Sequence, residues 1–167
     1  MSNSKQAFSA DGYLVDQNYT EEYKYGHFTS NFNGCGWIAM FNLLQAAGKQ
    51  VHAEDVHRGL AEILPYAGFL GTPLKTMRRY LKQQNIAYDE IKGKRKINSA
   101  IAGYSCGILR FLRKKELHFV AFTRVDDHKL RFFNVYDGKE DYICTMAEFL
   151  ADKISSFPTV VSFLIKK

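Results

Sequence analysis

The sequence predicts an α+β domain in which a helical first half packs against an antiparallel sheet formed by the second half. Apolar residues recur with helical spacing between residues 36 and 85. Segments rich in aromatic and β-branched residues alternate with charged turns between residues 104 and 165. A length of 167 residues fits one domain, which we expect to span 1–167 with an irregular lead-in over 1–30.

The helices of the first half follow from apolar spacing and from helix-ending residues. In the first, Trp37, Phe41 and Leu44 form one apolar face, so we expect it to be buried. Thr72 followed by Pro73 predicts an N-cap with proline at the first helical position of another helix. We expect helices over 36–47, 53–64 and 72–85, with a weaker one over 97–103.

The second half has the composition of a sheet. Strands are expected over 87–91, 106–112, 118–125, 130–137, 141–145 and 159–165. Thr145 and Glu148 have the spacing of a capping box, which predicts one further helix over 146–153.

Composition excludes several classes of protein. With 46% hydrophobic and 24% charged residues, the chain is that of a folded globular protein. No apolar run approaches the roughly 18–20 residues that a membrane span needs, and residues 1–13 do not have the pattern of a secretory signal. Three cysteines are an odd number and a poor disulfide framework, which favours a reducing compartment. We therefore expect a cytoplasmic protein without a membrane span.

The net charge of +6 does not by itself identify a partner. Basic clusters at 77–80, 92–96 and 113–115 are expected to be solvated faces, and no nucleic-acid motif accompanies them. His52 and His57 are five residues apart and do not share a helix face, and no Cys–His set has zinc spacing. We therefore expect no nucleic-acid partner, no metal and no cofactor, and the oligomeric state stays open.

The strongest local signal is the segment NGCGWIAM, in which Cys35 begins an apolar helix between Gly34 and Gly36. Free N–H groups at a helix start stabilise a thiolate, which predicts a thiol pKa below the ordinary value of about 8.5. The flanking glycines would let a substrate backbone approach the sulfur, and Trp37 is close enough to line a substrate groove. The amide of Cys35 could bind a developing oxyanion. Cys106 and Cys144 are expected to be buried small hydrophobes.

A nucleophilic thiol needs a proton partner, and His118 is the candidate because it opens an apolar strand. The return strand offers two acceptors that could orient its ring, Asn134 and Asp137. A two-residue turn at 127–128 would place Asp137 opposite His118, whereas a three-residue turn centred on Asp126 would place Asn134 there. The sequence leaves this choice open.

These residues resemble those of papain-like cysteine peptidases, in particular the bacterial peptidases that process bacteriocin leaders after a double glycine, and their stand-alone relatives. The matching segments are NGCGWIAMFNLL, GTPLKTMRRYLKQQNI, HFVAF and FFNVYDG, within residues 30–140. The resemblance implies a papain-like fold, with Cys35 as nucleophile and His118 as general acid and base. The family spacing of sixteen residues after the histidine favours Asn134 over Asp137 as the third residue.

The sequence departs from that family at one position. The family commonly has a glutamine six residues before the cysteine as an oxyanion donor, and here Thr29 stands there. Asn31 or Asn33 could supply a side-chain amide instead.

The function expected from these residues is that of a cysteine hydrolase, in particular a peptidase, acting on a peptide or protein through a thioacyl-enzyme. Two alternatives remain open at this stage. The same thiolate could serve an acyltransferase or deamidase, and the fold could be kept as a non-catalytic binding module.

Overall fold

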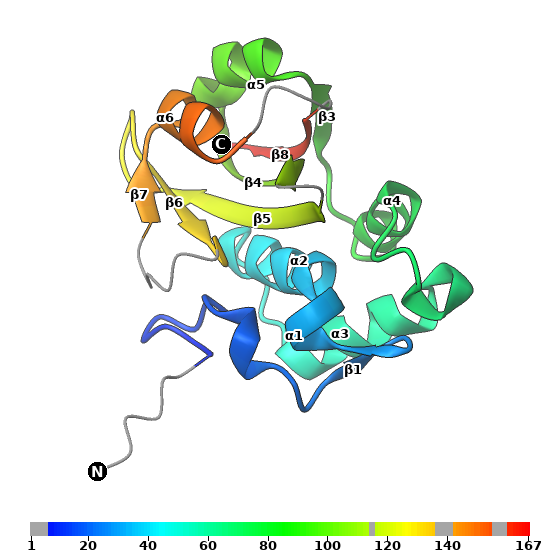
Figure 1. The fold of residues 1–167 in the computed structure, drawn as a ribbon. Helices are drawn as coiled ribbons and strands as arrows, with labels where there is room; N and C mark the ends of the chain where they lie inside the picture. Colours follow the sequence, from blue (N-terminus) through cyan, green and yellow to red (C-terminus); the bar gives the residue numbers. More distant parts are fainter. Residues whose placement is uncertain (1–6, 114–115, 136–141, 155–159) are drawn as a thin grey trace.

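The centre of the molecule is an antiparallel sheet with the strand order β3-β8-β4-β5-β6-β7, seen in a computed structural model that describes residues 7–113, 116–135, 142–154 and 160–167 (Figure 1). The strands are β3 (Asp89–Lys92), β4 (Tyr104–Arg113), β5 (Glu116–Arg124), β6 (Leu130–Phe133), β7 (Tyr142–Cys144) and β8 (Val161–Lys166). The last strand in sequence, β8, lies between β3 and β4. The second half of the chain therefore forms the sheet, as predicted.

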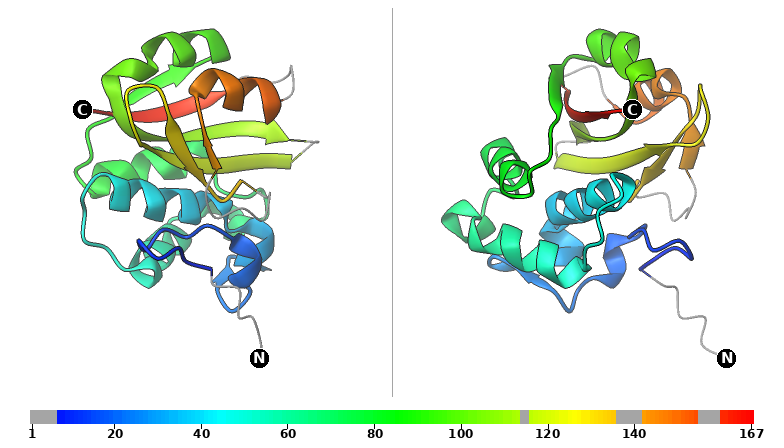
Figure 2. Two further views of the ribbon diagram at one scale, coloured as in Figure 1. Left: turned by 90° about the vertical axis from the view of Figure 1, so that its left-hand side faces the viewer. Right: turned by 180° about the vertical axis from the view of Figure 1, so that it is seen from behind.

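Helices cover both faces of this sheet (Figures 1 and 2). One face packs on α2 (Cys35–Ala46), behind which lie α3 (Ala53–Glu62) and α4 (Leu74–Gln83). The other face packs on α5 (Lys94–Ala100) and α6 (Met146–Asp152). A helical layer on one side of the sheet only is what the sequence predicts. Both faces are covered because β4, β5 and β6 carry apolar side chains on both faces of the sheet. These side chains form two separate buried clusters, one on each face.

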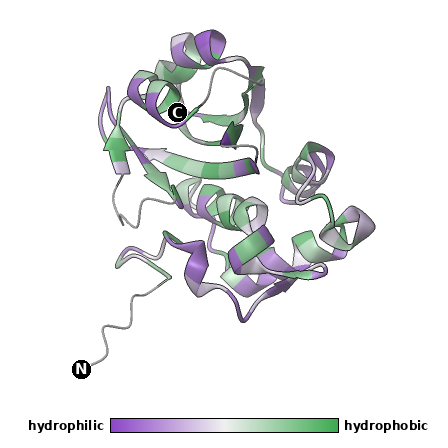
Figure 3. Cartoon of the chain, viewed as in Figure 1, coloured by the Kyte–Doolittle hydropathy of each residue, from purple (hydrophilic) through white to green (hydrophobic). Residues whose placement is uncertain are grey.

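The helix α2 is the buried helix that the sequence predicts. Nine of its twelve residues are buried, and it lies against β5 (Figure 1). Hydrophobic residues predominate in α2 and in the middle of β5, whereas α4 mixes hydrophobic with hydrophilic residues (Figure 3). A helix that is apolar on all sides needs burial on all sides, and α2 obtains it between the sheet and α3.

Some element boundaries differ from those expected. The helix α4 begins at Leu74 with Pro73 as its N-cap, and the Thr72 hydroxyl is 3.1 Å from the Tyr25 hydroxyl instead of capping the helix. The capping box of Thr145 and Glu148 is confirmed at the start of α6.

The hairpin between β5 and β6 has neither of the two registers considered. Ala121 pairs with Phe133 and Arg124 with Leu130. This register corresponds to a three-residue turn centred on Asp127, in which the Asp126 carboxylate accepts hydrogen bonds from the amides of His128 and Lys129. Such a side-chain turn competes with the tight two-residue hairpin. Because β6 ends at Phe133, Asn134 is not a strand partner of His118.

The lead-in contains several short elements: the 3₁₀ turn η1 (Gln17–Tyr19), the strands β1 (Lys24–Tyr25) and β2 (Phe28–Thr29), and the helix α1 (Ser30–Asn33), which runs into α2. Two further 3₁₀ turns are η2 (Pro65–Gly68) and η3 (Ile101–Gly103). Among the described residues, no helix has the length and apolarity that crossing a membrane would require.

Candidate active site

A cleft of about 610 Å³ lies where α1, α2 and the start of β5 meet. Cys35 and His118 both line it, so the fold brings together the two residues that the sequence proposed as a pair. Its remaining lining residues are Asn31, Phe32, Asn33, Leu70, Gly71, Thr72, Arg113, Glu116, Leu117 and Phe119.

Cys35 is the first residue of α2, with Gly34 as the N-cap. The next residue, Gly36, packs so closely on Thr72 that a Cβ built on it would lie 2.2 Å from the Thr72 hydroxyl oxygen. Only glycine fits at this point. The helix start is thus held against the Thr72 segment, which lines the same cleft.

Burial raises the pKa of the Cys35 thiol to about 11. Main-chain hydrogen bonds from Phe119, Gly36 and Cys35 itself act in the opposite direction, and the nearby Glu116 carboxylate adds to the increase. The helix start alone predicts a lowered pKa for this thiol. That expectation is wrong because removing the anionic sulfur from water costs more than the helix amides return.

His118 is 2% exposed, and its ring packs edge-on against Phe111 at a centroid distance of 5.8 Å. Burial lowers the pKa of its imidazole to about 4; the hydrogen bond to Asn134 opposes this shift, and the Arg113 charge adds to it. At neutral pH the histidine is therefore uncharged and the thiol carries its proton. The resting pair is neutral and not a thiolate–imidazolium ion pair.

The ring of His118 is oriented by the main chain of Asn134, whose carbonyl oxygen is 2.9 Å from Nε2. A carbonyl oxygen can only accept, so Nε2 carries the hydrogen and Nδ1 is the basic nitrogen of the neutral ring. The Asn134 side chain bonds elsewhere, to Gln17. The alternative acceptor, Asp137, lies outside the described residues.

The two candidate oxyanion donors differ in their surroundings. Asn33 donates from Nδ2 to the carbonyl of Gly68 at 2.8 Å, which ties α1 to the loop before α4. Asn31 accepts at Oδ1 from the Thr29 hydroxyl. Both asparagines line the cleft, and because Nδ2 of Asn33 is bonded to Gly68, the amide of Asn31 is the remaining candidate donor.

The predicted substrate-groove residues Gly34, Gly36 and Trp37 are all buried and do not line the cleft. Trp37 is 0% exposed because its indole N–H donates to the Ser30 hydroxyl at 2.9 Å and its ring packs edge-on against His57. Trp37 is thus bonded to α1 through Ser30 and offers no surface to a ligand.

The three cysteines are free thiols in different settings. Cys106 is 0% exposed in the core, as predicted, whereas Cys144 is only half-buried at the sheet edge. Within the described ranges, no group of three or more His, Cys, Asp or Glu side chains could hold a metal ion.

Two buried polar residues near the site were not recognised in the sequence. Gln17 lies in the lead-in and bonds to Asn134 and Asn31. The hydroxyl of Tyr25 bonds to that of Thr72, which lines the cleft. Neither belongs to a motif, and each meets the site only through tertiary contacts. Exposed apolar side chains at the cleft, Phe32, Leu70 and Leu117, were also not predicted.

Comparison with known proteins supports the fold. No family model and no curated protein matches this sequence. Among solved structures, the chain is similar to the peptidase domain of Streptococcus ComA, a bifunctional ABC transporter involved in a quorum-sensing pathway. The TM-score is 0.54 at 12% identity, over 81% of this chain and 93% of that one. The chain therefore has the fold of a peptidase domain, which confirms the predicted fold class.

Proposed function

We propose that the protein is a cysteine peptidase in which Cys35 attacks a peptide carbonyl and His118 transfers the proton. The observation that carries this proposal is the shared cleft, in which a thiol at a helix start and a buried, oriented imidazole face the same space. The likeness of the fold to a peptidase domain supports it.

The charge state of the pair determines the first step. Since the thiol and the imidazole are both neutral at rest, His118 acts as a general base through Nδ1 while the Cys35 sulfur attacks the carbonyl carbon. The sulfur–carbon bond forms as the thiol proton passes to the ring. The oxyanion that develops is stabilised by the Cys35 amide and the Asn31 side chain.

The second half of the reaction reverses the proton movement. The imidazolium of His118 returns the proton to the leaving amine, and the C–N bond breaks to give a thioacyl-enzyme. A water deprotonated by His118 then hydrolyses the thioester and regenerates the thiol. Burial of His118 disfavours the imidazolium. The Asn134 carbonyl opposes this effect, because it accepts a hydrogen bond from Nε2–H and stabilises the ring when it becomes charged.

A thiol-directed peptidyl epoxide tests this assignment on the full chain, with peptide mapping to locate the label. The expected result is labelling of Cys35 that is lost in Cys35→Ala and strongly reduced in His118→Gln. Cys144→Ala is the matched control, because it removes a half-buried thiol that does not line the cleft and should leave labelling unchanged. Label on Cys144 or Cys106 with Cys35 untouched would contradict the proposal.

Product analysis separates hydrolysis from acyl transfer on the same thiol. A peptide substrate incubated with a primary amine yields only free acid if water is the acceptor, and an amide if the amine competes. A chain that cleaves no member of a peptide library, and whose Cys35 is not labelled by the peptidyl epoxide, is a binding module instead.

A further inference from the structure

Gln17 is a buried glutamine whose side-chain oxygen and nitrogen both have hydrogen-bond partners. It is 1% exposed; its Oε1 accepts from Nδ2 of Asn134 at 2.8 Å, and its Nε2 donates to the carbonyl of Asn31 at 2.8 Å. Its main-chain N–H also donates to Oδ1 of Asn134 at 3.1 Å. Leaving a buried amide without partners is unfavourable, so these bonds strongly restrict both residues.

Asn134 is the residue whose position these bonds fix. It is 4% exposed and follows directly after the end of β6, with φ of 62° in the left-handed region. Asparagine tolerates this conformation better than most residues do. Its side-chain amide makes two hydrogen bonds to Gln17, and its carbonyl oxygen accepts one from Nε2 of His118. A rotation of Asn134 would therefore break bonds to Gln17 and to His118 together.

The other partner of Gln17, Asn31, lies on the nucleophile side of the cleft. Asn31 belongs to α1, which ends just before Cys35, and its side chain is the proposed oxyanion donor. One glutamine side chain thus connects the residue that holds the imidazole with the short helix that leads to the thiol.

We propose that Gln17 is a positioning residue, which holds the Asn134 carbonyl against His118 and sets the ring of that histidine relative to Cys35. This inference rests on the proposed function. It assigns to the irregular lead-in a part in the active site, although none of its described residues, 7–30, lines the cleft.

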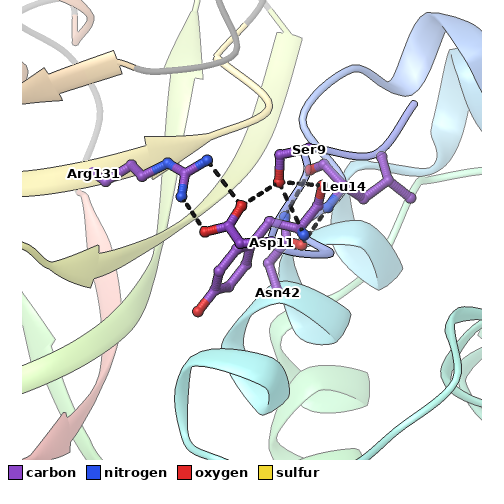
Figure 4. A network of polar contacts seen from close by, with 6 residues as sticks. Ser9, Asp11, Leu14, Asn42 and Arg131 are labelled. Carbon is purple, nitrogen blue, oxygen red and sulfur yellow. Dashed lines mark hydrogen bonds and ion pairs between the residues drawn. The ribbon is translucent and has the colours of Figure 1, made fainter. Parts of the chain in front are cut away.

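The lead-in has other anchors that do not involve Asn134 (Figure 4). Asp11 pairs with Arg131 on β6, and the main chain of Leu14 exchanges two hydrogen bonds with the Asn42 side chain on α2, at 2.9 and 2.8 Å. These anchors provide a control. Asp11→Asn weakens the attachment of the lead-in at an exposed point, without touching the contact between Gln17 and Asn134.

The test compares Gln17→Met with Asp11→Asn in the full chain. The first readout is ¹⁵N NMR of the His118 ring, which reports which nitrogen carries the hydrogen and at what pH the ring is protonated. The second is the rate constant for alkylation of Cys35 by iodoacetamide. Met has nearly the shape of Gln but makes none of its hydrogen bonds.

In the wild type and in Asp11→Asn, we expect the Nε2–H form of the neutral ring. In Gln17→Met, we expect a mixture of both neutral forms, a shifted protonation midpoint and alkylation slowed by up to about 100-fold. A purely structural role would lower the stability of both variants and leave the ring signals at wild-type values. That result would overturn the proposal.

Asn134→Gly provides a second route if Gln17→Met does not fold, because glycine suits the backbone conformation at this position. It keeps the carbonyl but removes the side chain that Gln17 holds. We expect it to reproduce the ring signals of Gln17→Met, and the double variant to add little, since both changes remove one contact. Wild-type ring signals in Asn134→Gly would refute the coupling.

The ring signals do not depend on catalysis. A protein that cleaves no peptide but shows the expected change in the His118 ring would refute the peptidase proposal and leave the positioning role of Gln17 intact.

Discussion

His118 is held by the main chain of Asn134 and not by its side chain, with Nε2 of the ring 2.9 Å from the carbonyl oxygen. The family resemblance implies that Asn134 orients the imidazole, and in the structure the bond to the ring is made by the carbonyl of Asn134. Because every residue has a carbonyl, the chemistry at Nε2 depends on the backbone conformation at position 134 more than on the identity of the side chain. The side chain contributes by keeping that conformation in place through Gln17.

The neutral resting pair predicts how the reactivity of Cys35 depends on pH. With a thiol pKa of about 11 and an imidazole pKa of about 4, no thiolate accumulates at acidic pH. The rate of alkylation by iodoacetamide should therefore rise continuously between pH 6 and pH 9. The measurement uses Cys144→Ala, so that a second half-buried thiol does not contribute. A rate that is already constant below pH 6 would indicate an ion pair and would exclude the neutral pair.

Protonation of His118 should destabilise the folded protein. The pKa of its imidazole falls from 6.5 to about 4 on folding because the ring is buried. Between these values the unfolded chain binds more protons than the folded one, so stability is fully present above pH 6.5 and is lost as the pH falls toward 4. A shift of this size corresponds to about 3 kcal/mol.

The measurement is the free energy of unfolding in urea at pH 7.5 and at pH 4.5, for the wild type and for His118→Gln. Other groups titrate in both proteins, so the difference between the two proteins isolates the histidine. We expect the wild type to lose more stability than the variant. Equal losses in both proteins would mean that the ring is not buried in its neutral form.

Local patterns predicted most of the fold. The apolar face of 36–47, the aromatic strands and the capping box at Thr145 each depend on neighbours in sequence, and each is found within a few residues of its expected place. The second helical layer over the sheet was not predicted, because α5 and α6 are short and their packing depends on which residues of the strands face them.

The candidate site was only partly predictable, because its geometry depends on contacts between residues that are distant in the sequence. Cys35 and His118 carry chemistry that sequence patterns reveal, and the structure places both at one cleft. The pKa of Cys35 was predicted in the wrong direction because burial is a property of the fold and not of the helix start. Gln17 lies 117 residues from Asn134 in sequence, so no local pattern could have connected them.

The two asparagines before Cys35 should differ in their effect on catalysis. Asn31→Ala removes the proposed oxyanion donor, and loss of one such donor typically slows acyl-enzyme formation by about 10²–10³-fold. Asn33→Ala removes the bond to the Gly68 carbonyl, which should cost about 1 kcal/mol of stability and leave the chemical step largely intact. Single-turnover labelling by an activated ester, combined with urea unfolding, separates the two effects. If Asn33→Ala slows the chemistry more than Asn31→Ala does, then Asn33 is the donor.

Substitution of Gly36 should show how tightly the nucleophile helix is seated. A Cβ at this position would lie 2.2 Å from Oγ1 and 2.5 Å from Cβ of Thr72, which is itself buried and bonded to Tyr25. Alanine within a helix stabilises the folded protein by about 1 kcal/mol relative to glycine. Forcing an extra carbon into a packed contact lowers the free energy of unfolding by about 1–3 kcal/mol. The clash should dominate, because the atoms it meets include a Cβ that cannot rotate away. We therefore expect Gly36→Ala to lower stability and to slow the labelling of Cys35 by displacing the start of α2.

Gly103→Ala is the matched control for this substitution, because a Cβ at Gly103 meets no atom within 4 Å. It should leave both the unfolding free energy and the labelling rate near their wild-type values. In a background of Thr72→Ala, which removes Oγ1 and the methyl group from the contact, Gly36→Ala should cost less than it does in the wild type, because residues in direct contact do not have additive effects. If the cost of Gly36→Ala is the same in both backgrounds, then Thr72 is not what excludes a side chain at position 36, and the close contact between the helix start and the Thr72 segment does not constrain the nucleophile.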